Sequence, residues 1–177
     1  MIKESRKMYV EDKQTGEKFD VEIGRVELKE FAGLKKSQRF YFDWSKYKGE
    51  EVYKLYINGA KEVLGLMRVI DRPEPGHDYL EIDVLEISKE NQGKEKGLGR
   101  IGGCLLGFAA LLSDEYGHEG FLALVAKNKK ASLFHKKYGF QYIGSIAVLG
   151  ERMMSDTRNS IELVKEYMDK TISDETR

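Results

Sequence analysis

The chain has little cysteine, little proline and no net charge. Its single cysteine, Cys104, excludes an internal disulfide and argues against a cysteine-based metal site, so we expect no metal. Its two prolines, Pro73 and Pro75, stand in one connection, and no proline-rich linker divides the sequence. The 30 Lys and Arg residues balance 30 Asp and Glu residues. No overall field therefore draws the protein to nucleic acid, which would need a local cluster of charge.

A long apolar run is also missing. Residues 101–112, the longest stretch of this kind, are shorter than the ~20 residues that cross a bilayer. The N-terminus lacks the apolar segment of a signal peptide. We therefore expect a cytoplasmic protein without a membrane partner. At 177 residues, with 41% hydrophobic and 34% charged residues, the chain has the size and composition of a single globular domain.

The first half of the chain is typical of antiparallel strands. Apolar and polar residues alternate before Asn58-Gly59, a strong hairpin signal, and a second strand follows it. Residues 28–48 are expected to form short helical pieces or loop. The strands that we expect are residues 8–11, 18–26, 52–57, 63–70 and 79–87.

The second half alternates helices and strands. Apolar residues at spacings of three and four predict a helix over residues 97–113. Asn128 is a good N-cap and Gly139 a good stop for a second helix. The remaining elements that we expect are strands at 121–126 and 140–154, broken near Gly144 and Gly150, and an amphipathic helix at about 156–172. The fold class is therefore α/β with a mixed sheet, an α+β arrangement.

A glycine-bearing loop before the first of these helices is the main chemical signal. It reads Gln92-Gly93-Lys94-Glu95-Lys96-Gly97-Leu98-Gly99-Arg100. The first turn of a helix carries N–H groups without an internal partner and a partial positive charge, and glycines let phosphate oxygens reach them. Lys94, Lys96 and Arg100 add full positive charge there. A solvated loop before a closely packed helix is the plainer alternative.

The helix itself is rich in glycine. Gly99, Gly102, Gly103 and Gly107 should each cost about 0.5–1 kcal/mol relative to alanine, so a ligand or another element is expected to approach closely. The loop does not match the Gly-x-x-x-x-Gly-Lys-Ser/Thr motif of mononucleotide sites. The spacing Gly97-x-Gly99-x-x-Gly102 does satisfy the dinucleotide fingerprint. Hairpins precede it, however, and the next strand ends without a carboxylate, so the context disfavours a Rossmann fold.

A third interpretation explains more of the chain. Lys94-x-x-Gly97-x-Gly99 resembles the Gln/Arg-x-x-Gly-x-Gly/Ala pyrophosphate motif of the GNAT (Gcn5-related) N-acetyltransferase superfamily. Downstream, Asn128-x-x-Ala131-x-x-Phe134-His135-x-Lys137-x-Gly139-Phe140 is similar to that family's second motif. Two departures stand out. Either Lys94 or Gln92 fills the Gln/Arg place, and His135 stands where the family commonly has tyrosine.

The resemblance implies one N-acetyltransferase domain over residues 1–177, with an antiparallel N-terminal half and a βαβα C-terminal half around a splayed central sheet. The acetyl-CoA motifs would cover about 79–140, the acceptor-site half about 28–78, and the C-terminal helix about 156–172. An acetyl group would pass directly from acetyl-CoA to a primary amine of a small molecule or of a peptide or protein. The resemblance does not identify the amine.

The resemblance also implies which residues hold coenzyme A. The pantetheine arm would pair with the backbone of Leu85 and Ile87, which flank Glu86, and Asn128 would hold it from the other side. Lys127, Lys129 and Lys130 either meet the 3′-phosphate or are solvated. The remaining cofactor-binding residues that we expect are Gln92, Lys94, Lys96, Gly97, Leu98, Gly99 and Arg100 in the loop, and Ala131, Phe134 and His135 in the second motif.

The chemistry requires a base for the amine and an acid for the leaving thiolate. Three strand carboxylates, Glu81, Asp83 and Glu86, are the candidate bases, and Glu86 points to the other face. The resemblance favours Asp83, which falls closest to where some members of that family place a catalytic carboxylate. His135, as imidazolium, or Tyr138 is the candidate acid. Each of these residues has a plainer alternative as a solvated carboxylate or a packed ring.

Other features leave the function less defined. The aromatic residues Phe40, Tyr41, Phe42, Trp44 and Tyr47 form either a wall for a cationic acceptor or part of the core. His77 and His118 are predicted to be surface residues, and Cys104 a buried thiol. The sequence leaves open a homodimer, a coenzyme A-binding sensor or interaction module without catalysis, and a toxin-like enzyme that acetylates charged tRNA.

Overall fold

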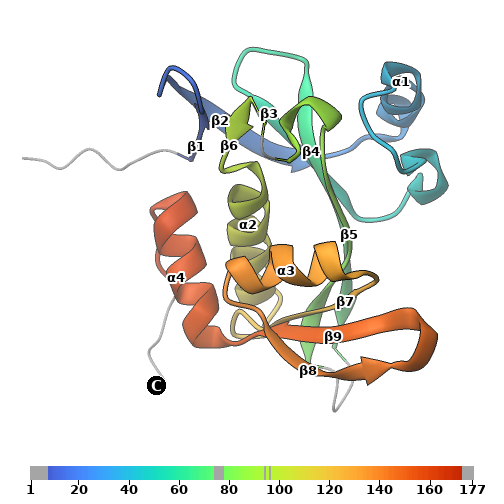
Figure 1. The fold of residues 1–177 in the computed structure, drawn as a ribbon, viewed down its shortest axis with the longest axis vertical. Coiled ribbons are helices and arrows are strands. Elements are labelled where there is room, and N and C mark those ends of the chain that lie inside the picture. Colours follow the sequence, from blue (N-terminus) through green and yellow to red (C-terminus); the bar gives the residue numbers. More distant parts are fainter. Residues whose placement is uncertain (1–7, 74–77, 94, 96, 173–177) are drawn as a thin grey trace, which may run out of the picture. The chain divides into compact units, whose positions relative to one another are not determined.

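The computed structural model describes residues 8–73, 78–93, 95 and 97–172. The chain divides into two compact units. The first unit comprises Met1–Val69 and Val84–Leu105, and the second comprises Ile70–Asp83 and Leu106–Arg177. Each unit contains strands of a sheet and at least one helix (Figure 1).

The first unit is built on a sheet with the strand order β6-β1-β2-β3-β4-β5. Neighbouring strands from β6 to β4 are antiparallel. The predicted turn at Asn58-Gly59 joins β3 to β4, with Gly59 at a φ of +83°. The strands are β1 (Tyr9–Asp12), β2 (Lys18–Arg25), β3 (Val52–Ile57), the first part of β4 (Val63–Arg72), the last part of β5 (Tyr79–Ile87) and β6 (Leu98–Gly99).

The helical pieces of the first unit lie between β2 and β3 and after β5. They are η1 (Leu28–Glu30), α1 (Phe31–Ser37), η2 (Trp44–Tyr47) and η3 (Lys89–Asn91). Apolar side chains of α1, of η2 and of the segments beside them form a core with the strands. Its buried members are Val26, Phe31, Phe40, Trp44, Val52 and Leu66. Burial of such side chains is worth about 1.5–3 kcal/mol each, so this core holds the segment between β2 and β3 in place.

The second unit contains a mixed sheet with the order β5-β7-β9-β8. Strands β5 and β7 are parallel, pairing Leu80 with Leu122 and Glu81 with Ala123. The other neighbours are antiparallel. Its further elements are most of α2 (Ile101–Glu115), β7 (Leu122–Ala126), α3 (Lys129–Lys137), β8 (Gln141–Ile146), η4 (Ala147–Leu149), β9 (Gly150–Ser155) and α4 (Thr157–Met168). The predicted mixed α/β fold class is confirmed.

The predicted start of the glycine-rich helix was wrong. Residues 97–100 are not helical, because Leu98 and Gly99 form the short strand β6 and pair with Asp12 and Glu11 of β1. Arg100 follows with a φ of +78°, and α2 begins at Ile101. Pairing with a strand almost 90 positions away therefore overrides the helical spacing of Leu98.

The predicted cap and stop of α3 are confirmed. The side-chain Oδ1 of Asn128 accepts a hydrogen bond from the Ala131 N–H at 2.8 Å. Gly139 has a φ of +87°, which other residues rarely adopt, and it ends the helical segment. Helix α4 is capped in the same way, because Asp156 Oδ1 accepts from the Asn159 N–H at 2.9 Å.

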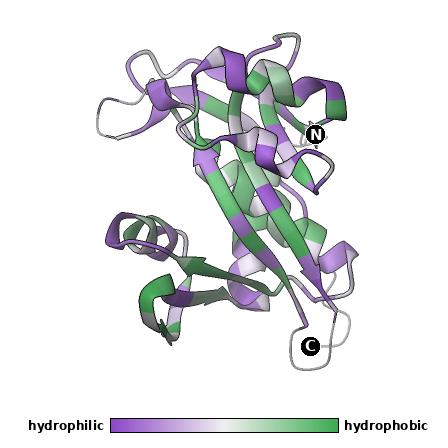
Figure 2. Ribbon diagram, turned by 90° about the vertical axis from the view of Figure 1, so that its right-hand side faces the viewer, coloured by the Kyte–Doolittle hydropathy of each residue, from purple (hydrophilic) through white to green (hydrophobic). Residues whose placement is uncertain are grey.

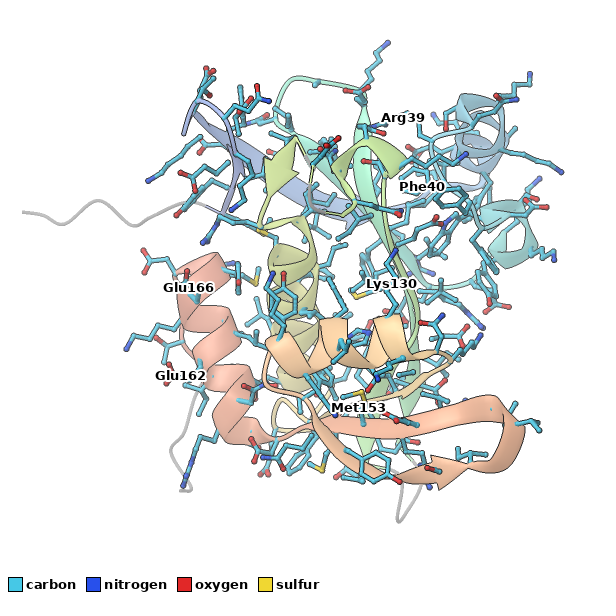
Figure 3. The ribbon with its side chains drawn as sticks, in the orientation of Figure 1. Arg39, Phe40, Lys130, Met153, Glu162 and Glu166 are labelled. Carbon is cyan, nitrogen blue, oxygen red and sulfur yellow. The ribbon has the colours of Figure 1, made fainter. Side chains whose placement is uncertain are left out.

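Gly107 shows one reason for the glycine content of α2. A Cβ at Gly107 would lie 3.2 Å from the Leu163 carbonyl oxygen and 3.3 Å from the Tyr167 Cβ. Helix α4 therefore packs against α2 through its backbone at this point. Glu162 and Glu166 project from the outer side of α4 (Figure 3), so α4 buries one face and exposes the other.

Candidate functional site

Strand β5 ends in the first unit at the turn that carries the predicted phosphate loop. The residues predicted to pair with pantetheine, Leu85 and Ile87, lie in the last part of β5. Gln92 closes the turn, because its side-chain Nε2 donates a 2.5 Å hydrogen bond to the Ile87 carbonyl oxygen. Gln92 therefore joins the loop to the strand. The predicted loop residues Lys94 and Lys96 lie outside the described residues.

A buried asparagine, which the sequence analysis missed, organises this turn. Asn91 is 4% exposed. Its Nδ2 donates to Ser88 Oγ at 2.9 Å, and its Oδ1 accepts from the Leu98 N–H at 2.9 Å. No sequence signal distinguished Asn91 from its polar neighbours, because the bond to Leu98 spans seven positions and depends on how the loop closes.

Arg39, which precedes the core residue Phe40, also holds the turn that follows β5. It donates a 2.5 Å hydrogen bond to the Val63 carbonyl oxygen, and its guanidinium forms an ion pair with Glu90. The Arg39 carbonyl oxygen also accepts from the Lys89 N–H at 2.9 Å. Figure 3 shows Arg39 beside Phe40, the next residue along the chain and a member of the core. The turn is thus fixed on both sides within the first unit.

The backbone pairing of the loop determines which amides are available to a ligand. The Gly97 N–H donates to the Glu90 carbonyl oxygen at 3.4 Å, and the Leu98 N–H donates to Asn91. The amides of these two predicted cofactor-binding residues are therefore engaged inside the protein. The first amides of α2 without an intrahelical partner belong to Ile101, Gly102 and Gly103, all of which are buried.

Arg100 lies against β1. Its guanidinium stacks over the Tyr9 ring, with 4.0 Å from Cζ to the ring centroid, and its Nε donates to the Tyr9 carbonyl oxygen at 3.3 Å. Arg100 therefore places positive charge beside the start of α2 while it ties the loop to β1.

Cys104, on the first turn of α2, is a buried thiol, as predicted. It is 0% exposed, and its Sγ lies 3.4 Å from the Tyr9 carbonyl oxygen. Burial raises the pKa of the Cys104 thiol to about 12, although the nearby Arg100 opposes the shift. A thiol held neutral in this way is a poor nucleophile.

The three candidate bases occupy different surroundings. In the second unit, Glu81 forms an ion pair with Arg72 at 3.4 Å. Asp83 lies two residues further along β5, on the same face, and is partly buried. In the first unit, Glu86 has a carboxylate that is already surrounded by donors. It accepts from the Tyr41 N–H at 2.6 Å, the Phe42 N–H at 3.2 Å and the Trp44 Nε1–H at 2.9 Å.

The aromatic residues between α1 and η2 divide between core and surface. Phe40 and Trp44 are buried in the core, and Tyr41 is 75% exposed. Phe42 and Tyr47 are partly buried and stack with their ring centroids 5.2 Å apart. The Arg68 guanidinium lies 4.5 Å from the Tyr47 centroid. A cation of the protein itself therefore already covers one of these rings.

Helix α3 carries the second predicted motif, in the second unit. A cavity of about 410 Å³ lies beside its N-terminus, and Lys127, Asn128 and Ser132 line it together with Glu151. Ser132 donates to Glu151 at 2.6 Å across this cavity wall. Ala131 is partly buried and belongs to the first turn of α3.

His135 does not fit the predicted role of imidazolium acid. Its side chain is packed between Phe134 and Phe140, with ring centroids 5.0 and 5.3 Å away, and the residue is 8% exposed. Its Nδ1 has no hydrogen-bond partner among the described residues. Burial lowers the pKa of His135 to about 4, so the ring is neutral at neutral pH. Tyr138 caps the end of α3 and packs against Phe134 at 5.1 Å.

His118 is buried, and its prediction as a surface residue was wrong. It is 3% exposed. Its two ring nitrogens bind the carboxylates of Asp71 and Asp78, which lie on either side of the connection between β4 and β5. Burial lowers the pKa of His118, but the two carboxylates outweigh it and the net pKa is raised. His77 lies outside the described residues.

Within the described part of the chain, no group of three or more His, Cys, Asp or Glu side chains is arranged to hold a metal ion. Within the same residues, no helix is long and apolar enough to cross a membrane.

The comparisons with known proteins give the fold. No family model matches the sequence, and no curated protein matches it. A GNAT-family acetyltransferase from Listeria monocytogenes aligns over 80% of this chain and 96% of its own, with a TM-score of 0.53 and 15% identity. The PaiA N-acetyltransferase from Thermoplasma acidophilum, in complex with coenzyme A, aligns over 77% and 99%, with a TM-score of 0.55 and 15% identity.

A third solved structure is a toxin. A mutant of AtaT, bound to acetyl-CoA and to the C-terminus of the antitoxin AtaR, aligns over 81% of this chain and 98% of its own, with a TM-score of 0.52 and 20% identity. All three structures share the fold with little sequence identity. This chain therefore has the fold of the GNAT acetyltransferases, as the two motifs predicted.

Proposed function

We propose that this chain is an acetyl-CoA-dependent N-acetyltransferase that passes an acetyl group directly to a primary amine of a small molecule or of a peptide or protein. The turn between β5 and α2 carries this assignment. It joins a strand to a buried, glycine-rich helix start, on a fold that holds acetyl-CoA in the AtaT structure and coenzyme A in the PaiA structure.

The phosphates belong at the start of α2. Gly97 and Leu98 already donate their N–H groups within the protein, so the donors that we assign to pyrophosphate are Ile101, Gly102 and Gly103. Glycine at two of these three positions lets a phosphate oxygen come close to the backbone, and the helix dipole favours its negative charge. Gln92 keeps the loop attached to the end of β5, where we assign the pantetheine arm to the backbone of Leu85 and Ile87.

Acetyl-CoA supplies the acetyl group as a thioester, which an amine attacks only when the amine is neutral. A base must therefore take a proton from the ammonium form, directly or through water. We assign this role to Asp83, a partly buried carboxylate of β5 that falls closest to where some members of the family that this chain resembles place a catalytic carboxylate. Much of the rate enhancement would come from holding the two reactants together.

Glu86 and His135 have positioning roles in this proposal. The three donors on the Glu86 carboxylate tie β5 to residues 41–44 of the acceptor-site half, so Glu86 shapes the site instead of accepting the substrate's proton. His135 is neutral and packs α3 onto Phe140, so it supplies no proton to the leaving thiolate at neutral pH. We assign that proton to water or to the Tyr138 hydroxyl.

Cofactor binding is the first test. Acetyl-CoA and coenzyme A should raise the melting temperature of the wild-type protein by mass action, and titration calorimetry should give a dissociation constant. Gly97→Glu places a carboxylate in the loop, with its Cβ 3.3 Å from Asn91 Oδ1, and should abolish the shift. Gly33→Glu is the matched control, because it adds the same charge to α1, where a Cβ meets nothing within 4 Å.

A second pair of variants tests Asn128 without removing its helix cap. Asn128→Asp keeps the oxygen that accepts from Ala131 but replaces the amide donor by a negative charge, so it should weaken binding at unchanged stability. Asp156→Asn makes the reverse exchange at the cap of α4 and should change neither. Equal binding by Asn128→Asp and wild type would remove Asn128 from the site.

Turnover separates the enzyme from the sensor. Coenzyme A released in the presence of an amine panel can be measured with a thiol reagent, because Cys104 is 0% exposed and stays silent. Asp83→Asn should lose most of the turnover but keep cofactor binding. Binding without release of coenzyme A against any amine would instead support the non-catalytic coenzyme A-binding module.

A further inference from the structure

The turn between β1 and β2 lies against the predicted phosphate loop, within the first unit. The Lys13 N–H donates a 2.9 Å hydrogen bond to the Gly97 carbonyl oxygen. The residue before it, Asp12, pairs with Leu98 of β6. Two segments that lie far apart in the sequence are therefore fastened to each other immediately before α2 begins.

The side chain of Lys13 lies over Gly99, one of the two glycines of the loop motif. Gly99 is buried, and a Cβ at this position would overlap Lys13 Cε and lie 2.9 Å from Lys13 Nζ. Because glycine has no Cβ, the lysine side chain can cross the backbone here. The structure therefore places an ammonium group directly above the loop.

The charge of Lys13 is not neutralised by a neighbouring carboxylate. Asp12, the adjacent acidic residue, accepts hydrogen bonds from the N–H groups of Gln14 and Thr15 at 2.8 and 3.0 Å, so its carboxylate closes the turn. Among the residues that the structure describes, Lys13 forms no ion pair. Its ammonium group is therefore available to an anion that reaches the loop.

Helix α2 brings no charged side chain to its own first turns. Residues 101–112 contain no Asp, Glu, Lys or Arg, and Figure 2 shows α2 largely in green and white. The first amides of α2, which we assign to the pyrophosphate, supply only partial positive charge. Ile101 follows Gly99 by two residues, which span at most about 7 Å, so the ammonium group of Lys13 lies close to this helix start.

We infer that Lys13 is a ligand of the coenzyme A pyrophosphate, supplied by the β1–β2 turn in addition to the loop and the start of α2. This inference rests on the proposed function, because it requires the cofactor to bind at that helix start. A lysine is a compact charge with three N–H donors on a flexible stem. Lys13 can therefore move from Gly99 onto a phosphate oxygen while its backbone hydrogen bond to Gly97 holds the turn in place.

Titration calorimetry of the full chain with coenzyme A and with dephospho-coenzyme A, which lacks the 3′-phosphate, tests this assignment. Lys13→Gln should weaken the binding of both on the order of 10-fold, because both carry the pyrophosphate. The difference from wild type should shrink when the salt concentration rises from about 0.05 to about 0.5 M. Lys13→Arg keeps the charge and should retain most of the affinity. Lys36→Gln is the matched control, since it removes one exposed charge from α1 of the same unit and should bind as wild type does.

Lys13 is exposed and its hydrogen bond to the loop uses the backbone, so folding should be unaffected, and an unchanged unfolding transition checks this. Equal affinity of Lys13→Gln and wild type for coenzyme A would overturn the inference and leave the proposed function intact. A loss with coenzyme A but not with dephospho-coenzyme A would also overturn it, because Lys13 would then contact the 3′-phosphate. A wild-type protein that binds neither compound would refute the proposed function and this inference together.

Discussion

Removing the Glu86 carboxylate should destabilise the protein through the loss of three hydrogen bonds. The donors are the Tyr41 and Phe42 N–H groups and Trp44 Nε1–H, and Trp44 is 1% exposed. Hydrogen bonds to a charged group are worth about 1.5–3 kcal/mol when buried, and the partial exposure of Glu86 lowers each of these three to the typical net value of about 1 kcal/mol. Glu86→Ala should therefore lower the free energy of unfolding by about 3 kcal/mol, which corresponds to roughly 6–12 °C in melting temperature for a chain of this size.

Trp44 is the only tryptophan of the chain, so its fluorescence follows this region during urea unfolding. Glu86→Gln keeps one oxygen but turns an amide towards a donor. Its loss in the free energy of unfolding should be about half as large as that of Glu86→Ala. Glu81→Ala is the control, because it removes a single, partly exposed ion pair to Arg72 and should cost less than about 1 kcal/mol.

Two outcomes would refute the positioning role of Glu86. Stability of Glu86→Ala within about 0.5 kcal/mol of wild type would mean that the three hydrogen bonds do not hold residues 41–44. A Glu86→Gln protein with unchanged stability and a turnover lost in a pH-dependent way would identify Glu86 as the base, in place of Asp83.

Three further predictions concern buried titratable groups. Burial lowers the pKa of His135 from 6.5 to about 4, so the unfolded chain binds more protons than the folded chain between these two pH values. The urea midpoint of the wild-type protein should therefore fall as the pH drops from about 6.5 to 4. In His135→Phe the urea midpoint should depend less on pH over this range. The net pKa of His118 is raised, so its contribution to the free energy of unfolding is fully present below the ordinary histidine pKa and is lost as the pH rises through the raised value. The difference in the free energy of unfolding between wild type and His118→Gln should therefore shrink as the pH rises through the raised value. Cys104 should not react with a thiol reagent at pH 8 in the native protein and should react fully in urea, and fast native labelling would contradict its burial.

Local signals in the sequence predicted the elements that depend on near neighbours. The hairpin at Asn58-Gly59, the Asn128 cap and the Gly139 stop were all confirmed, because each depends on residues within a few positions. The order of elements and the two motifs also predicted the mixed α/β fold. The same local rules failed at Leu98, which has the helical spacing but pairs with β1.

Only the tertiary structure decided the surroundings of the candidate site residues. Glu86 meets residues about 45 positions away, and His118 meets Asp71 and Asp78 at separations of 47 and 40. Arg39 likewise meets Glu90 at a separation of 51 positions, and Arg100 meets Tyr9 at a separation of 91. A one-dimensional pattern records which side chains share a face, but the charge and hydrogen bonding of each depend on contacts between distant segments. The sequence by itself therefore determined the elements, the fold class and the candidate residues, and the tertiary structure decided which of those residues are engaged, neutral or available.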